Sequence, residues 1–408
     1  MPHAAIRLSS AFKRLAWSNL AAQSAEQIGL AAAPLVAVLA LGAGAGATGL
    51  LQTAQTLPFL LLAIPAGVLA DRLSRRRLMV AAEALRAASL ATVLVLATLG
   101  LLNLPLLALL GFIGAAGTVA YGVAAPSLVP ALVPGAALAA ANARIELART
   151  IAFAAGPALA GALVGWTGAP PAFAVAAALS ALAVLLLAGL REPPRPKLPP
   201  RHPLHDLKEG AAFVFGHALL RPIFATQLLF NIAFFVLQAV YVPYAVHRLG
   251  LSASAVGGTL ATYGIGMVAG ALLAGRISRA LPFGTVIAIG PLAGLTAALL
   301  MVLTIWLPSA LLAGASFFLM GAGPILWVIS TTTLRQTVTP PALLGRVSAI
   351  YLAAYGARPI GAAIGALVGA TWGAETCLVV AALGFLAQAA VILASPVPHL
   401  ARQPQMAG

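Results

Sequence analysis

The chain has 408 residues, of which 62% are hydrophobic and only 8% are charged, and its mean hydropathy is +1.03. Soluble domains carry about one charged residue in four, so this composition excludes a soluble globule and indicates lipid as the solvent for most of the surface. The net charge of +15 does not indicate nucleic-acid binding, because the basic residues lie between apolar runs rather than in a stripe with aromatic residues.

Apolar runs separated by glycine, proline and arginine predict twelve transmembrane helices, since a span needs about 20 apolar residues. The first six are expected at residues 14–41, 46–70, 77–101, 104–127, 141–165 and 170–190. The other six are expected at residues 222–247, 252–275, 283–306, 308–331, 346–370 and 375–395. The first run has no clear small-residue cleavage site, so we expect it to be retained as a span.

Lysine and arginine residues gather on alternate connections of these spans. They occur at Arg7, Lys13 and Arg14, at Arg72 and Arg75–Arg77, between Arg191 and Arg221, at Arg276 and Arg279, and at Arg335 and Arg346. On the opposite side, Arg248 is the exception in connections that are otherwise nearly free of basic residues. Because positive charge accumulates on cytoplasmic loops, this pattern predicts that both termini are cytoplasmic.

The first span carries polar residues on one helix face. Asn19, Gln23, Glu26 and Gln27 follow one another at helical spacing. Polar groups at membrane depth are unfavourable unless they have a function or a partner. Glu26, near mid-span, is therefore a candidate to bind a proton or a cationic group of a substrate. The alternative is a structural carboxyl group that is hydrogen-bonded to a neighbouring helix.

The connection after the second span has a distinctive sequence. It reads Gly67-Val-Leu-Ala-Asp71-Arg72-Leu-Ser74-Arg75-Arg76-Arg77. Gly67 allows close helix approach, Asp71 can accept bonds from a neighbouring helix N-terminus, and the arginines can pair with that acid or contact lipid phosphates. This sequence resembles the signature loop of the major facilitator superfamily, with Ser74 in place of a second glycine. The plain alternative is an ordinary positively charged cytoplasmic loop.

Two pairs of opposite charges stand three residues apart, a spacing that brings side chains together on a helix. Glu83 and Arg86 are expected in the first turns of span 3, where they would support the cytoplasmic loop. Glu146 and Arg149 are expected near the start of span 5, as a pair that neutralises itself or takes part in a conformational change.

The fifth span contains Gly156 and Pro157, followed by Gly161 and Gly165. Proline removes a backbone hydrogen bond, and glycines permit tight helix contact. This arrangement resembles the fifth-helix motif of proton-coupled exporters in the same superfamily. Many drug/proton antiporters also carry an arginine in the fourth helix. The fourth span here has none, which argues against a proton relay of that design.

Residues 191–221 separate the two sets of spans. The segment begins with a charged, proline-rich run that is typical of an extended linker, and residues 204–219 then alternate polar and apolar positions as a membrane-surface helix does. The sequence thus predicts an N-terminal six-helix half at residues 1–190 and a C-terminal half at residues 222–408. Such halves suit parallel repeats about an axis along the membrane normal.

The second half repeats features of the first. Gly270, Gly275, Arg276 and Arg279 resemble a degenerate copy of the loop after span 2, which indicates an internal duplication. The loop between Arg335 and Arg346, together with Ala125-Pro126-Ser127 at the exit of span 4, resembles the bacterial exporter branch that contains enterobactin-type siderophore and macrolide efflux proteins.

This resemblance covers nearly the whole chain and implies an all-α membrane protein of twelve helices in two pseudo-symmetric halves. It implies a monomeric secondary transporter in the bacterial inner membrane that exports a drug or siderophore by alternating access with proton coupling. The alternative is an importer or uniporter of a small metabolite or lipid on the same fold. A conformational latch is expected at Gly67, Asp71, Arg72, Arg75, Arg76, Glu146, Arg149, Gly156 and Pro157.

The resemblance also implies that spans 1, 4, 7 and 10 line a central cavity. Polar and aromatic contacts to a substrate are then expected from Gln227, Asn231, Gln238, Tyr241 and Trp327, besides Asn19, Gln23, Glu26 and Gln27. Arg358, deep in span 11, needs an anion or an acidic partner, so it is a candidate for binding a substrate carboxylate or for a buried structural lock.

The sequence contains no recognisable catalytic motif. A phosphate-binding Gly-x-x-x-x-Gly-Lys loop and a His-Glu-x-x-His zinc motif are both missing. The single cysteine, Cys377, excludes an intrachain disulfide and a cysteine-based metal cluster. His202 and His205 have a metal-like spacing but fall in the proline-rich linker. We therefore expect no enzymatic activity, cofactor or metal, and a small molecule and the bilayer as partners.

Overall fold

The computed structural model describes residues 9–134, 137–192, 203–340 and 343–404, which contain helices and no strand. The N-terminal half comprises α1 (Ser10–Leu39), α2 (Ala45–Leu61), α3 (Ala63–Arg72), α4 (Arg75–Thr98), α5 (Leu104–Leu132), α6 (Leu138–Thr167) and α7 (Ala169–Ala188). Then follow α8 (Pro203–Gly216), α9 (Leu220–His247), α10 (Ala253–Ala280), α11 (Phe283–Leu303), α12 (Ala310–Val338), α13 (Leu344–Ala353), η2 (Ala354–Ala357), α14 (Arg358–Thr371), α15 (Gly373–Leu393) and η3 (Val397–His399).

The described part of the chain contains 11 helical segments long and apolar enough to cross a membrane. The remaining predicted span is the pair α2 and α3, which meet at Leu62. Pro65, in the first turn of α3, has no backbone N–H to donate to the preceding turn, which interrupts the helical hydrogen bonds here. The Leu62 N–H still donates to the Pro58 carbonyl of α2 at 2.8 Å. The prediction of an all-helical protein with twelve spans is therefore confirmed, and the chain is a multi-pass membrane protein.

The predicted span at residues 346–370 also departs from one regular helix. The structure divides it into α13, the 3₁₀ turn η2 and α14, with Pro359 in the first turn of α14. Proline is well tolerated at this position but cannot donate to the preceding turn. The break places Tyr355 and Arg358 at the wall of a cavity described below.

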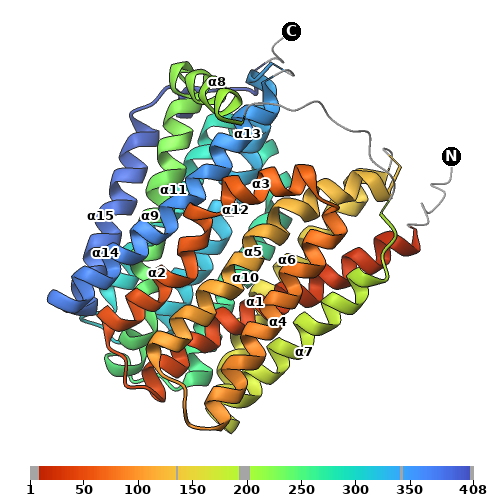
Figure 1. Ribbon diagram of the computed structural model, residues 1–408. Coiled ribbons are helices and arrows are strands. Elements are labelled where there is room, and N and C mark those ends of the chain that lie inside the picture. The colour runs from red at the N-terminus through yellow and green to blue at the C-terminus, as the bar shows by residue number, and fades with distance from the viewer. Residues whose placement is uncertain (1–8, 135–136, 193–202, 341–342, 405–408) are drawn as a thin grey trace.

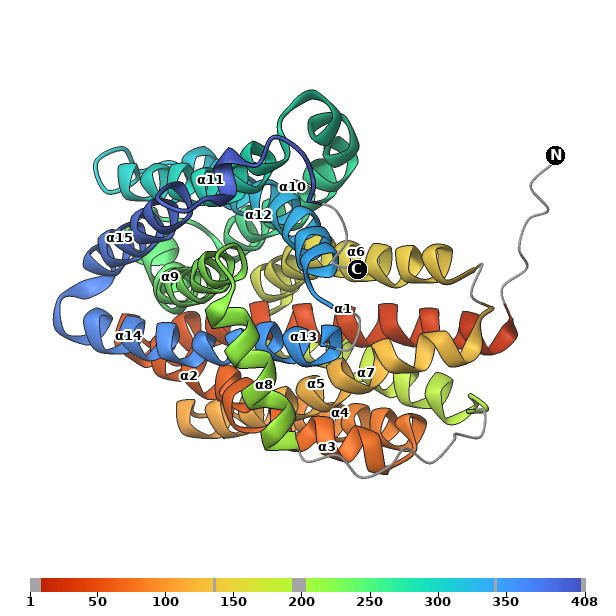
Figure 2. The ribbon, with the colours of Figure 1, turned by 90° about the horizontal axis from the view of Figure 1, so that it is seen from above.

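The two halves form two bundles, with α8 and the end of the chain on one face of the molecule (Figure 1). We call this end, where α1 begins and α3, α7, α10 and α12 end, the α8 face. Seen from that face, α1 to α5 and α7 lie on one side, α9 to α12 and α15 lie on the other, and α6 and α14 lie between them (Figure 2).

Helix α8 belongs to the predicted linker and packs on α13 of the C-terminal half. An Arg346 guanidinium nitrogen lies 2.6 Å from a Glu209 carboxylate oxygen, and Gly210 lies directly against the Arg346 backbone. Residues 193–202 and the side chain of His205 lie outside the described residues, so the predicted extended part of the linker, with His202, stays a prediction.

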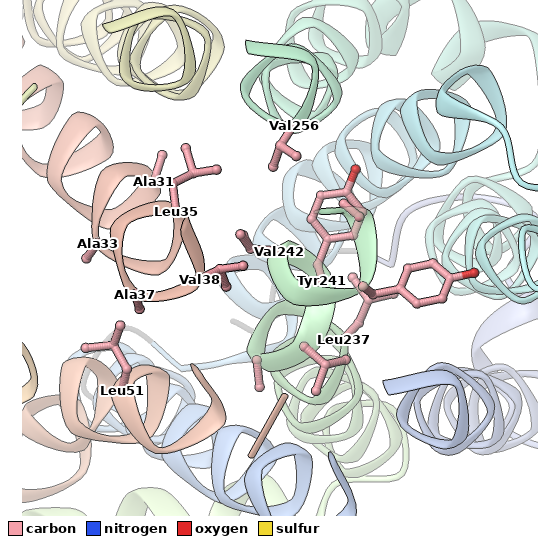
Figure 3. Packing of buried hydrophobic residues seen from close by; sticks show 14 of the residues in the cluster. Ala31, Ala33, Leu35, Ala37, Val38, Leu51, Leu237, Tyr241, Val242 and Val256 are labelled. Atoms are coloured by element: carbon pink, nitrogen blue, oxygen red, sulfur yellow. The ribbon is translucent and has the colours of Figure 1, made fainter. Parts of the chain in front are cut away.

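The hydrophobic core shows where the halves meet. One buried cluster contains residues of both halves, including Leu35 and Val38 of α1 and Leu237 and Val242 of α9, and Figure 3 shows Val38 beside Val242. Two other clusters lie nearer the α8 face, and each contains residues of only one half. Because buried apolar surface holds elements together, the halves are joined at the face opposite α8 and are separate near the α8 face.

Glycine contacts close the joined end. An added Cβ at Gly257 of α10 would lie 2.8 Å from Gly161 Cα of α6. On the other side of the interface, an added Cβ at Gly49 of α2 would lie 2.8 Å from Ala366 Cβ of α14. Side chains larger than hydrogen do not fit between backbones this close, as in other small-residue contacts of membrane helices.

We call the contact between Gly161 of α6 and Gly257 of α10 the glycine seam. Replacing Gly257 with leucine should separate the two helices at this contact. Overpacking costs about 1–3 kcal/mol, and this penalty applies only while the two backbones touch. We expect a cysteine placed at buried Val38, in a chain with Cys377→Ser, to react faster with a water-soluble thiol reagent when Gly257→Leu is present. The matched control is Gly258→Leu, because nothing lies within 4 Å of an added Cβ at Gly258. Equal labelling rates in the two variants would contradict a close contact of α6 and α10 at the glycine seam.

Candidate functional site

A cavity of about 720 Å³ lies between the two halves. This volume falls within the range of small-molecule sites in proteins. Its wall includes residues of α1, α2, α4, α5 and α6 from one half and of α9, α10, α12, α13 and α14 from the other. Toward the α8 face it reaches Arg335, Ser348 and Leu352. Elsewhere its wall includes residues of the shared apolar cluster, such as Val242 and Phe317.

A buried charge cluster forms the N-terminal wall of the cavity. Arg86 Nη1 lies 2.6 Å from Glu83 Oε1, and Arg86 Nη2 donates to Thr118 Oγ1 at 2.6 Å. Ser180 Oγ donates to the other Glu83 oxygen at 2.8 Å. Glu83 and Arg86 are buried, so this pair is compensated by several hydrogen bonds, as a pair away from water requires.

Glu26 approaches this cluster from α1. Its Oε2 lies 3.7 Å from Arg86 Nη2, and its side chain lines the cavity and retains 15% of its exposure. The Arg86–Glu26 contact is looser than the Arg86–Glu83 contact. The arrangement can therefore change the charge of Glu26 while Arg86 keeps its principal carboxylate partner.

The expectation that Glu83 and Arg86 support the cytoplasmic loop from the first turns of span 3 is wrong. Helix α4 begins at Arg75, which puts both residues two to three turns inside the span, where they are buried against α1, α5 and α7. The spacing of three residues predicted the Glu83–Arg86 pair. It gave no sign that Arg86 also contacts Glu26, because that contact joins α4 to α1.

Arg358 lies in an aromatic cage on the other side of the cavity. Its guanidinium carbon lies 4.3 Å from the ring centre of Tyr355, 4.8 Å from that of Phe59 and 5.4 Å from that of Phe235. Its Nε donates to Asn231 Oδ1 at 3.3 Å. Among the described residues, no carboxylate lies within 4 Å of this guanidinium.

Several other predicted contacts also reach the cavity. Gln27, Gln227, Asn231, Gln238 and Trp327 line it. Gln227 Nε2 donates to the Tyr351 carbonyl at 3.0 Å, and Asn231 Nδ2 donates to the Gln227 carbonyl at 2.9 Å. The buried indole nitrogen of Trp327 has no hydrogen-bond partner in the described part of the chain.

Three predicted contacts lie elsewhere. Asn19 and Gln23 are not among the described lining residues, and Asn19 Nδ2 donates to the Ile145 carbonyl, which ties α1 to α6. Tyr241 is fully buried away from the cavity, with its hydroxyl bonded to Thr259 and its ring edge-on to Phe317. The structure therefore does not bring Asn19, Gln23 or Tyr241 into the site.

The loop after α3 is held differently from the sequence expectation. The backbone N–H groups of Arg75 and Arg76 donate to the two carboxylate oxygens of Glu192, each at 3.2 Å. A carboxylate at a helix N-terminus is favourable, so Glu192 caps α4 from the end of α7. The side chains of Asp71 and Arg72 lie outside the described residues. Gly67 makes no close approach, since nothing lies within 4 Å of an added Cβ there.

The remaining residues of the predicted latch lie on α6. Arg149 Nε donates to both Glu146 carboxylate oxygens, at 3.1 and 3.0 Å, and both side chains are at least one-third exposed. Arg149 and Pro157 line the cavity. Gly156 provides a close contact, because an added Cβ would lie 2.5 Å from Gln27 Cβ of α1.

Sequence reasoning also missed polar and aromatic lining residues, of which four stand out. Phe59 completes the cage around Arg358, and Arg335 lies 4.7 Å above the ring of Tyr351. The side-chain oxygens of Gln55 and Gln388 are buried without a hydrogen-bond partner in the described residues. Glutamines in apolar runs were a usable signal, but a phenylalanine in such a run gave none.

Comparison with known proteins places this geometry in a family. Residues 15–366 match the family model described as Major Facilitator Superfamily. The chain is 26% identical to the multidrug efflux pump Tap of Mycobacterium tuberculosis over 85% of this chain and 84% of Tap. It is 28% identical to the enterobactin exporter EntS of Escherichia coli, over 70% of this chain and 68% of EntS.

Another relative is an uncharacterised MFS-type transporter, y4rN, of Sinorhizobium fredii. It is 32% identical over 59% of this chain, and the match covers 60% of y4rN. The crystal structure of the nucleoside transporter NupG superimposes with a TM-score of 0.74 at 15% identity, over 95% of this chain and 99% of NupG. At that identity, the likeness concerns the fold.

Proposed function

Because the chain belongs to the major facilitator superfamily of transporters, we propose that it exports a small organic molecule by alternating access, in exchange for protons. Glu26 is the proton site in this proposal. The observation that carries it is the arrangement of Glu26 and Arg86 at the cavity wall, 3.7 Å apart, with Glu83 held to the same arginine at 2.6 Å.

The arrangement lets Glu26 bind a proton without leaving Arg86 unpaired. When Glu26 is ionised, it faces Arg86, and it also lies within electrostatic range of Arg149 and Arg358. When Glu26 is protonated, Arg86 keeps its bonds to Glu83, Thr118 and the Ala22 carbonyl. Both charge states are therefore compatible with the low-dielectric interior.

The direction of access follows if the termini are cytoplasmic, as the distribution of basic residues predicts. The α8 face is then the cytoplasmic face, and the cavity is accessible to a cytoplasmic substrate. Rocking of the halves would separate the seam at Gly161 and Gly257 and release the substrate outside. The exporter relatives Tap and EntS support this direction. An importer or uniporter is the second candidate, because the fold, which the nucleoside transporter NupG shares, does not by itself determine the direction of transport.

Inverted membrane vesicles test the direction. A stability screen of the purified protein against siderophores, antibiotics and lipids, at several pH values, first identifies a bound compound, because a ligand of the folded state raises its stability. We expect vesicles with an acidic lumen to accumulate that compound, and a protonophore to abolish the accumulation. Equal exchange in both directions without a gradient requirement would instead indicate a facilitator.

We also propose that the segment Gly67–Arg76 and the α6 residues Glu146, Arg149, Gly156 and Pro157 act as a conformational latch, with Asp71 as its acid. Replacing Asp71 with asparagine removes a charge that could hold the cytoplasmic ends of the halves together in the outward-facing state. We expect slower transport and greater thiol accessibility of cysteines on the α8 face. Unchanged accessibility at both faces would exclude a latch at Asp71.

A further inference from the structure

The charges that face the cavity do not balance. Among the described lining residues there are four arginines, Arg86, Arg149, Arg335 and Arg358, but Glu26 is the single acid. Arg86 and Arg149 each have a carboxylate on their own helix, Glu83 and Glu146. Arg335 and Arg358 have no described carboxylate within 4 Å. One ionised Glu26 cannot balance both, so the cavity retains positive charge.

Arg358 is the better placed of these two arginines to bind a ligand. A guanidinium has five N–H groups in a planar fork, and in the described residues a single side-chain hydrogen bond, from Nε to Asn231 Oδ1, is formed. The remaining donors lie at the cavity wall. Such a fork matches the two oxygens of a carboxylate or a comparable oxyanion.

The surroundings of Arg358 indicate what the anion is attached to. The cage rings come from both halves, since Phe59 lies on α2 while Phe235 and Tyr355 belong to α9 and η2. Phe153, Phe230, Phe234 and Tyr263 line the same cavity. Rings of this kind favour flat apolar or aromatic bodies through offset and edge-on contacts.

From this combination we propose that the transported substrate is an organic anion, with a carboxylate-like group bound by Arg358 and an aromatic or flat apolar body among the surrounding rings. This inference rests on the proposed function in taking the cavity as the substrate site.

Three matched probes test the charge preference: 2-naphthoate, its neutral methyl ester and the cation 2-naphthylmethylammonium. Binding to the purified full chain is measured by calorimetry at neutral pH, with no gradient. A charged hydrogen bond contributes about 1.5–3 kcal/mol, so we expect naphthoate to bind roughly 10- to 100-fold more tightly than the ester. The ammonium probe should bind most weakly.

Substitution of Arg358 locates the preference. Arg358→Gln should remove the advantage of naphthoate over the ester and leave ester binding unchanged, whereas Arg358→Lys should keep part of it because charge remains but the fork is lost. Arg279→Gln, at an exposed position of α10, should bind all three probes as the unchanged protein does.

Four results would overturn the proposal: tightest binding of the ammonium probe, absence of naphthoate binding at millimolar concentration, an unchanged preference in Arg358→Gln, or an equal loss for all probes in that variant. The last result would make Arg358 a structural lock. The assay uses no gradient, so failure of the exporter or proton-coupling proposal would leave its outcome unaffected.

Discussion

Replacing Glu26 with glutamine is expected to abolish gradient-driven transport while leaving the amount of folded protein in the membrane unchanged. Glutamine has nearly the same shape and can still accept a hydrogen bond near Arg86, but it cannot bind or release a proton in the working range. Because Glu83 and Thr118 hold Arg86 independently, the substitution should not strand a buried charge. Substrate exchange without a gradient should persist.

The measurement is accumulation in vesicles with an imposed pH gradient, compared with exchange in vesicles without one. Glu375→Gln is the matched control, because Glu375 is exposed and pairs with Arg248 at 2.8 Å outside the cavity. If Glu26→Gln accumulates substrate as the unchanged protein does, Glu26 is not the coupling site.

Replacing Glu83 with leucine should have the largest effect on stability. The substitution leaves Arg86 buried without its principal carboxylate, and Ser180 keeps only the backbone carbonyl of residue 83 as an acceptor. Removal of one partner from a buried ion pair costs about 3–5 kcal/mol. We therefore expect a large fall in the thermal midpoint of the purified protein, measured by the loss of its monodisperse form on heating.

The double variant Glu83→Leu with Arg86→Leu separates this explanation from a simple packing defect. Removing both charges should recover much of the lost stability, since a buried pair can often be replaced by apolar residues at little cost. Glu375→Leu should lower the midpoint only slightly, because exposed pairs contribute about 0–1 kcal/mol. A double variant as unstable as Glu83→Leu would contradict the ion-pair account.

The fold could be predicted because its signals are local or additive. Hydropathy identifies a span from its own residues, and the basic residues predict topology from their positions along the chain. The two helix breaks, at Leu62 and at η2, were missed although Pro65 and Pro359 mark both. A single proline within an apolar run does not distinguish a kink from an intact span.

The site was predictable only where its contacts lie within one helix. Spacing of three residues found the pairs Glu83–Arg86 and Glu146–Arg149. It could not find the contact of Glu26 with Arg86, or of Glu192 with the start of α4, because these residues are far apart in sequence and belong to different elements.

Helical spacing also selected residues that lie outside the cavity. Tyr241 follows Gln238 by three residues on α9, yet it faces Thr259 of α10 rather than the cavity. Asn19 and Gln23 share a face with Glu26, but the described cavity wall on α1 begins at Ala25. Periodicity gives the direction of a side chain around its own helix, while neighbouring helices decide where along that face a cavity lies.

The central claim is that substrate and protons move in opposite directions through the Glu26 site. Its most direct test uses proteoliposomes with no imposed pH gradient, loaded with a compound from the stability screen and a pH-sensitive dye. The account predicts that substrate efflux acidifies the lumen in the unchanged protein, and that Glu26→Gln shows no such acidification. Substrate efflux without a change in lumen pH, or acidification that persists in Glu26→Gln, would contradict it.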